Sequence, residues 1–210
     1  MTRREPLNRE KVLDAALALA DEEGLEGLSM RRLAKILGVE AMSLYNHVSN
    51  KADLLDGIAE RVFAQVERPD PELPWREQVR AVALNMYRAF LRHPVVPLAL
   101  VTDRSNPTSV RALEPLDALL GALFAAGFDE AGAWRALSAV NGLVFGTLLM
   151  STGGFSEADK SGARDTSAYV TRVDPVALPH FSRALSGAQD SVDVEADFLW
   201  ALDVLIRGLD

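Results

Sequence analysis

Hydrophobic residues recur at spacings of three and four along most of this 210-residue chain, with polar residues between them. This period is typical of helices that bury one face, because side chains three and four apart lie on the same side of a helix. Runs that alternate residue by residue, as in a half-buried strand, are scarce, and alanine and leucine dominate. The pattern predicts an all-α fold.

Capping residues, glycines and prolines divide the chain into about nine to ten helices. We expect helices over residues 8–23, 29–37, 40–48, 50–66, 75–92, 95–101, 108–126, 129–150, 175–187 and 194–209. Pro69, Pro71 and Pro74 mark a change of domain, so we divide the chain into residues 1–67 and 68–210. Residues 153–174 are rich in Gly, Ser, Thr and Asp, which indicates a loop that either borders a pocket or is disordered.

Two short helices joined at Gly38 form the most informative stretch. Ser29 is a good N-cap for the first of them. Leu33, Ile36 and Leu37, at spacings of three and four, should give this helix one apolar face. Gly38 then supplies the positive φ that a tight helix end requires.

The second short helix should turn Leu44 and Val48 inward, one helical turn apart. Its other side chains are small, flat or hydrogen-bonding, and none is acidic; they are Ala41, Met42, Ser43, Tyr45, Asn46 and His47. A helix that enters the major groove of DNA needs such an outer face. An antiparallel helix pair inside an all-α domain is the alternative, but the cations of the first helix, Arg31, Arg32 and Lys35, favour a DNA-binding helix-turn-helix.

On these residues the chain resembles the TetR (tetracycline repressor) family of one-component bacterial transcription regulators. The matching segments are residues 27–34, 37–39, 43–45, 47–48, 50–51 and 54–55. The resemblance implies an N-terminal three-helix helix-turn-helix DNA-binding domain. It also implies a larger C-terminal helical domain that binds a ligand and dimerises.

Residue by residue, the resemblance implies a set of DNA contacts. Tyr45 and His47 match residues that reach the DNA backbone, and Lys51 matches a phosphate contact at a helix N-terminus. Arg31 is the best candidate for a guanine contact, because arginine bonds O6 and N7 together. The full candidate set is Ser29, Met30, Arg31, Arg32, Ala41, Met42, Ser43, Tyr45, Asn46, His47 and Lys51. Ala41 and Asn46 depart from the larger types of the founding member, so the operator sequence does not transfer.

Residues 129–150 and 194–209 are apolar most of the way round, which is typical of helices buried on all sides. Two such helices in a modest domain leave an apolar face without an internal partner, and a fully internal core is the alternative. We expect the two helices to pair with those of a second subunit, as the resemblance also implies. The interface candidates are Trp134, Leu137, Val140, Val144, Leu148, Phe198, Leu202, Leu205 and Leu209.

The resemblance also implies an effector pocket between the helices at 75–92, 108–126 and 129–150. Its candidate residues are Asn85, Met86, Phe90, Thr102, Trp134, Asn141 and Phe145. For the polar residues among them, a structural or surface role is the alternative. Ala99 and Asn141 stand where tetracycline-binding members carry histidines for the drug–magnesium complex. We therefore predict an effector that is apolar with few polar groups, not tetracycline–magnesium, and no bound metal.

Composition and charge indicate where in the cell the protein acts and which kinds of partner it binds. The chain has no cysteine, so no disulfide framework is available. It begins without an apolar signal segment, and its apolar runs break before the roughly 18–20 residues of a membrane span; we expect a cytoplasmic protein without a membrane partner. The net charge is −8, but residues 1–51 hold eight basic and eight acidic residues. The acidic excess therefore lies in residues 52–210. Because the DNA-binding segment has no net charge, we predict a moderate electrostatic contribution to DNA binding.

The sequence shows no catalytic constellation. Its three histidines are scattered, and it has no Gly-rich phosphate loop or nucleophile elbow, so we predict no enzyme and no cofactor. The leading hypothesis is a homodimeric, ligand-responsive repressor that a small-molecule inducer releases from a palindromic double-stranded DNA operator. The alternatives are a small all-α enzyme and a helical small-molecule-binding or adaptor protein without DNA binding. Repression and activation are not distinguished.

Overall fold

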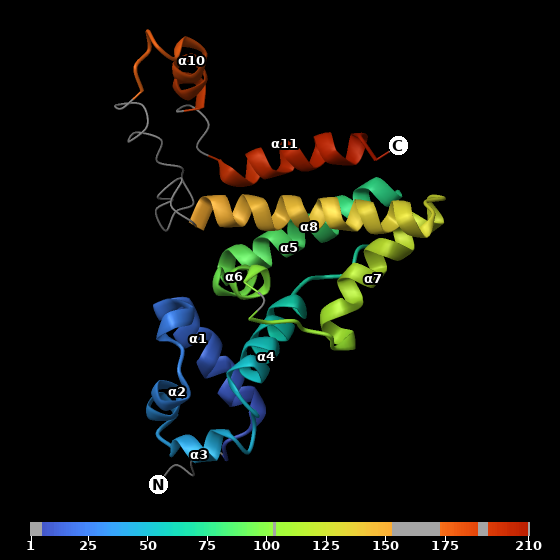
Figure 1. Ribbon diagram of the computed structural model, residues 1–210. Coiled ribbons are helices and arrows are strands. Elements are labelled where there is room, and N and C mark those ends of the chain that lie inside the picture. Colours follow the sequence, from blue (N-terminus) through green and yellow to red (C-terminus); the bar gives the residue numbers. More distant parts are fainter. Residues whose placement is uncertain (1–5, 103, 153–172, 189–192, 210) are drawn as a thin grey trace.

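The computed structural model describes residues 6–102, 104–152, 173–188 and 193–209 (Figure 1). Within these ranges the chain forms ten helices and no strand, which confirms the all-α prediction. The helices are α1 (Arg9–Gly27), α2 (Met30–Leu37), α3 (Ala41–Leu44), α4 (Lys51–Phe63), α5 (Trp75–Arg92), α6 (Val95–Val101), α7 (Val110–Ala125), α8 (Glu130–Thr152), α10 (Pro179–Ala188) and α11 (Val194–Arg207).

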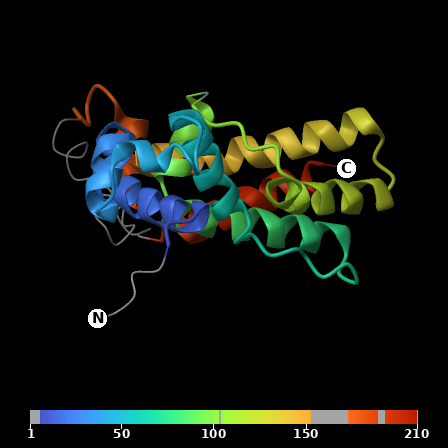
Figure 2. The same cartoon turned by 90° about the horizontal axis from the view of Figure 1, so that it is seen from below.

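The helices form two connected groups. Helices α1 to α4 gather at one end of the molecule, and α8 and α11 run side by side across the other end (Figure 1). Helix α5 packs between α7, α8 and α11, while α4 contacts α5, α6 and α7 as well as α1. Seen from below, α1 to α3 lie under one end of the longer body (Figure 2). Helix α4 therefore joins the two groups, and α1 adds a contact with α6.

Most helix boundaries lie close to the predicted ones. The ranges of α5 and α6 agree with the prediction residue for residue. Helix α1 contains a break at Gly24 (φ 73°), so its regular part ends at the predicted Glu23. Helix α3 is shorter than the predicted 40–48: it covers Ala41–Leu44 and continues as a hydrogen-bonded turn.

Many of the apolar positions with helical spacing are buried, but Ile36 on α2 and Leu113 on α7 are not. The α4 residues Leu54, Ile58 and Val62 are almost completely buried. Ile36, predicted on the apolar face of α2, is 56% exposed, because Leu33, Leu37 and the adjacent Ala34 define the buried side and Ile36 lies on its flank. Leu113 on α7 is 43% exposed, since the neighbouring Ala112 faces the core instead.

In the single chain α8 and α11 each leave an apolar face without an internal partner, as the sequence pattern predicts. One side of α8, with Val140 and Val144, is fully buried, whereas Trp134 is 65% exposed. On α11, Phe198 is buried and Trp200 is 69% exposed. Each helix thus buries one face in the protomer and leaves apolar side chains on the other.

Helix α8 contains a segment that the sequence analysis did not count as a possible membrane span. Its segment Glu130–Met150, 21 residues with a mean hydropathy of 1.2, is long and apolar enough to cross a membrane by length and composition. A third of it is buried inside the protein. A single helix of this kind is weak evidence, because the core helix of a soluble protein has the same composition.

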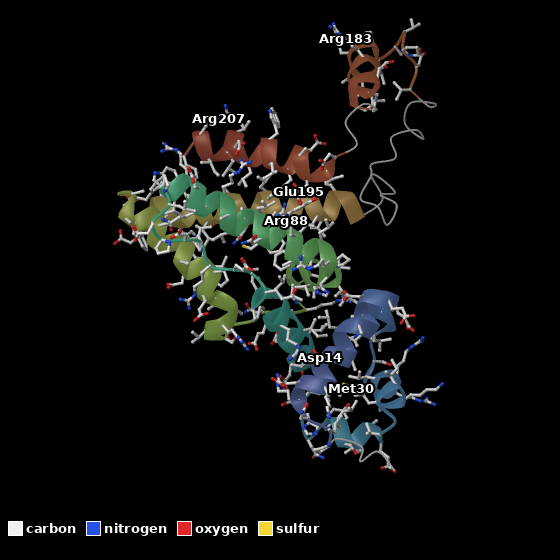
Figure 3. All side chains as sticks on the ribbon, turned by 180° about the vertical axis from the view of Figure 1, so that it is seen from behind. Asp14, Met30, Arg88, Arg183, Glu195 and Arg207 are labelled. Carbon is white, nitrogen blue, oxygen red and sulfur yellow. The ribbon has the colours of Figure 1, made fainter. Side chains whose placement is uncertain are left out.

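Helix α11 is fixed to α5 by a ring contact and an ion pair. The rings of Tyr87 and Phe198 stack with their centroids 4.3 Å apart. Beside them, Arg88 faces Glu195 (Figure 3), and its Nε donates to Glu195 Oε2 at 2.9 Å. Hydrogen bonding by the Arg88 guanidinium lowers the pKa of Glu195 below its ordinary value. These contacts decide which face of α11 is covered.

Helix α10 stands away from the bundle in both Figure 1 and Figure 3. Phe181 on α10 is 50% exposed, and Leu178, just before the helix, is 52% exposed. The N-terminal arm with Arg3 and Arg4 lies outside the described residues, as does all but the end of the loop predicted at 153–174.

Candidate functional site

The turn between α2 and α3 is built as the sequence predicts. The Ser29 side chain accepts a hydrogen bond from the backbone N–H of Arg32 at 3.3 Å, which caps α2. Gly38 ends α2 in the left-handed region (φ 65°), and Val39 N–H donates to Ala34 O at 3.0 Å. Only glycine adopts that φ without a steric penalty, so Gly38 fixes the angle between the two helices.

The recognition element, defined here as residues 41–48, has an inner and an outer side. Leu44 and Val48 are buried, which confirms their predicted role as anchors. Met42 is 73% exposed and Tyr45 45% exposed, and Asn46 is exposed beside them. The element therefore presents uncharged, hydrogen-bonding and apolar groups to solvent, the chemistry that base edges and thymine methyl groups require.

The cationic candidates differ in their surroundings. Arg31 is exposed on α2. Arg32 forms an ion pair with Glu23, so a neighbouring carboxylate offsets part of its charge. Lys51 Nζ donates to the backbone carbonyl of Leu25 at 3.1 Å. An ammonium has three N–H donors, so this bond orients Lys51 and leaves two donors for a phosphate.

A polar cluster behind the recognition element was not predicted as a whole. The capping residue Asn50 accepts from Asp53 N–H at 2.9 Å, as its sequence position indicated. Asp53 accepts from Ser49 N–H at 2.7 Å and from Arg9 Nη2 at 2.6 Å. The hydrogen bond from Arg9 lowers the pKa of Asp53 and raises that of Arg9. Only Asp53 gave a local signal, because Arg9 lies 44 residues earlier in the chain.

Contacts between the two helix groups were also missed. Asp56 on α4 accepts from Ser105 Oγ at 3.0 Å and from Asn106 N–H at 2.6 Å, in the segment between α6 and α7. In the same segment, Arg104 Nη1 donates to Glu26 Oε1 at 2.8 Å. This hydrogen bond lowers the pKa of Glu26. The α6–α7 segment therefore bonds directly to both α4 and the end of α1.

The predicted effector residues fall into three sets, which are buried, exposed and half-buried. Met86 and Phe90 are buried in the core, where Phe90 stacks on Phe145 with ring centroids 5.5 Å apart. Trp134 and Thr102 are exposed, so Trp134 on α8 lies away from that core. Thr102 Oγ1 bonds to Leu98 O at 2.7 Å. Neither side chain belongs to the buried set.

Asn85 and Asn141 are half-buried members of the same predicted site. The Oδ1 atom of Asn141 is buried and has no hydrogen-bond partner among the residues that the structure describes. Burying an amide oxygen without a partner costs free energy, so this atom is a candidate contact for a bound molecule.

The described structure also contains a groove of about 520 Å³ outside the predicted pocket. It runs between α1 and α4 and reaches the start of α7, and its lining includes Leu17, Arg61 and Arg111. In the described ranges no three His, Cys, Asp or Glu residues are grouped closely enough to hold a metal ion.

The predicted dimer residues also differ in their exposure in the single chain. Six of the nine, Leu137, Val140, Val144, Leu148, Phe198 and Leu202, are buried against the protomer's own helices. Trp134 is exposed, and Leu205 and Leu209 are half-buried. A partner could therefore contact these last three and the outward Trp200 and Val204, which the prediction omitted.

Two protein-family models match the chain. Residues 12–58 match the model of the bacterial regulatory proteins of the tetR family. Residues 68–210 match the model of the tetracyclin repressor-like C-terminal domain. The first match covers α2, α3 and the recognition element, and the second covers every helix from α5 onward.

Individual relatives point the same way. An HTH-type transcriptional regulator of Saccharopolyspora erythraea is 33% identical over 97% of this chain and 84% of its own. The class D tetracycline repressor of Escherichia coli is 32% identical over 97% and 89%. The Streptomyces coelicolor TetR family protein ActR, solved with actinorhodin, has a TM-score of 0.77 and 28% identity over 97% of both chains. This protein belongs to the TetR family and is a ligand-responsive, DNA-binding transcription regulator.

Proposed function

We propose that this protein is a homodimeric repressor that binds a palindromic operator and releases it when a small molecule binds the C-terminal domain. Two recognition elements, one from each protomer, enter successive major grooves about 34 Å apart. The observation that supports DNA binding is that residues 41–48 present an uncharged outer surface, while Leu44 and Val48 are buried beneath it. BioQ, solved with its operator, is 29% identical to this chain, which it matches over 71% with a TM-score of 0.61.

We place the DNA contacts at the eleven residues named from the sequence, with Arg31, Tyr45 and Lys51 as the main ones. Arg31 and Tyr45 are exposed, and Lys51 is oriented by its bond to Leu25 O. The domain boundary that we propose lies at residues 67–68, after α4 and just before the proline-rich stretch that leads to α5.

The proposed effector site lies around Phe90, Phe145 and the unpartnered Oδ1 of Asn141. Buried rings favour an apolar or aromatic molecule, and one buried acceptor provides for a single polar contact. Ala99 is buried and offers no metal ligand. The structural relative ActR has been solved with actinorhodin and with (S)-DNPA, which is consistent with an organic effector.

We propose that effector binding acts on the DNA-binding domain through the α6–α7 segment and through α4. This segment bonds to Asp56 on α4 through Ser105 and Asn106, while Phe63 at the end of α4 packs edge-on against Phe90 with centroids 5.2 Å apart. A molecule that displaced the rings around Phe90 would therefore act on the C-terminal end of α4, whose middle is bonded to the α6–α7 segment. Its effect on operator affinity would be a coupling free energy between two sites.

Operator binding in a salt series tests the DNA-binding role. The protein should bind a promoter fragment from its own upstream intergenic region, and log Kd should rise linearly with log salt concentration. Replacing Lys51 with alanine should weaken binding and reduce the salt slope by about one, because one phosphate contact is lost. Lys35→Ala, on α2, is the matched control for loss of a nearby lysine. A wild-type dimer that binds none of these fragments would favour the adaptor alternative.

Tetracycline with Mg²⁺ should leave the protein–operator complex intact. The reason is that Ala99 and Asn141 replace the histidines that the resemblance assigns to the drug–magnesium complex, so the chelate loses its imidazole ligands. Fluorescence anisotropy of labelled operator, with tetracycline and Mg²⁺ added together, is the measurement. The class D tetracycline repressor on its own operator is the positive control, and release of this protein at similar concentrations would overturn the prediction.

A further inference from the structure

The recognition element is helical only in its first half, and its second half is a turn. Only Ala41–Leu44 are α-helical, and the chain then turns, with the N–H groups of His47 and Val48 both donating to Leu44 O. Carbonyl groups at the end of a helix have no intrahelical partner and need one from elsewhere. The outward side chains Tyr45, Asn46 and His47 belong to this turn, so its orientation decides where they meet DNA.

Arg9 supplies the missing partner from the start of α1. Its Nη1 atom donates to the carbonyl oxygen of His47 at 2.8 Å. The same guanidinium bonds both carboxylate oxygens of Asp53, at 2.6 and 3.3 Å. Asp53 in turn accepts from Ser49 N–H at 2.7 Å. One guanidinium thus joins α1, the end of the recognition element and the first turn of α4.

The packing around Arg9 leaves room for this arrangement. A Cβ atom at Gly57 on α4 would lie 2.6 Å from Leu13 Cδ2 and 3.3 Å from Arg9 Nη2. Glycine at this position lets α1 approach α4 closely enough for Arg9 to reach across both. The fork of a guanidinium can hold a carboxylate and a carbonyl together, which a lysine ammonium cannot do with the same geometry.

From this geometry we infer that Arg9 is a positioning residue for operator recognition: it clamps the end of the recognition element, through His47 O and Asp53, in the orientation that binds DNA. The inference rests on the proposed operator binding. Exposed ion pairs usually add little to stability, and the side chains of Arg9 and Asp53 are 43% and 28% exposed. The effect should therefore appear in DNA affinity more than in the stability of the fold.

The test compares operator binding by the full-length dimer in three variants. Arg9→Met removes every donor at similar length and should weaken operator binding about tenfold, because charge-assisted hydrogen bonds are lost. Arg9→Lys should fall between wild type and Arg9→Met. Arg61→Gln removes the ion pair with Asp14, which also joins α4 to α1, but leaves His47 O untouched, and should change affinity less than about twofold.

Salt dependence and thermal melting separate positioning from the other roles of Arg9. A positioning residue leaves the salt slope of Arg9→Met at the wild-type value. A slope lower by about one would show that Arg9 itself contacts a phosphate, and would overturn the inference. Unchanged affinity at the same melting temperature, or equal losses in Arg9→Met and Arg61→Gln, would overturn it too. Failure of the wild type to bind any operator fragment would instead remove the proposed function, and this inference with it.

Discussion

Replacing Phe90 with alanine is expected to lower the free energy of unfolding by about 3–5 kcal/mol, as for other fully buried phenylalanines. The Phe90 side chain is completely buried on α5. Its ring packs edge-on against Phe63 of α4 and stacks on Phe145 of α8. The substitution therefore leaves a cavity where the two helix groups meet, and neither neighbouring ring can fill it without losing its own packing. Urea unfolding followed by far-UV circular dichroism measures the change.

Phe124→Ala is the matched control for Phe90→Ala. Phe124 lies near the end of α7 and is 48% exposed, so its removal creates little cavity and should cost less than about 1 kcal/mol. A loss below about 1 kcal/mol for Phe90→Ala would show that the site can collapse. That result would contradict a tightly packed junction at this ring.

Local chemistry explains why much of this structure could be predicted. The ends of α2 and α4 are fixed by Ser29, Gly38 and Asn50, whose side chain or φ acts on residues at most three positions away. The burial of Leu44 and Val48 follows from a spacing of one helical turn. Signals of this kind lie within a few residues of the element that they define, so a sequence displays them directly.

The parts that were not predicted depend on contacts between distant segments. Arg9 and Asp53 are 44 residues apart, and Asp56 meets Asn106 across 50 residues. A surface arginine or aspartate has the same appearance in a sequence whether or not it has a partner. The shortness of α3 has a similar origin, because the turn after Leu44 is stabilised by Arg9 from another helix.

The inward side of α8 was not predictable for a different reason. Apolar residues surround this helix, so a hydrophobic pattern does not distinguish the face toward α5 from the opposite face. The structure decides the matter: Val140, Val144 and Leu148 point into the protomer, and Trp134 and Met150 point out. The dimer contacts must then be sought on the outer face, beside Trp200 and Val204 of α11.

Replacing Trp200 with glutamate is therefore expected to dissociate the dimer. Trp200 is 69% exposed in the single chain, and burial of a tryptophan removes about 150–250 Å² from water, worth several kcal/mol. A two-fold interface contains each residue twice, so one substitution removes two such contacts and places two carboxylates in an apolar interface. Sedimentation velocity at micromolar concentration should show a monomer. Operator affinity should fall by at least about a hundredfold, because a monomer reads only one half-site.

Val110→Glu is the matched control, since Val110 is 78% exposed at the start of α7, away from α8 and α11. It introduces the same charge at an exposed apolar position and should leave both the dimer and operator binding unchanged. Leu202→Ala offers a second comparison: Leu202 is buried within the protomer, so its loss should lower the melting temperature while the protein remains a dimer. A Trp200→Glu protein that stays dimeric would place the interface elsewhere, and the outward face of α8 and α11 would need another explanation.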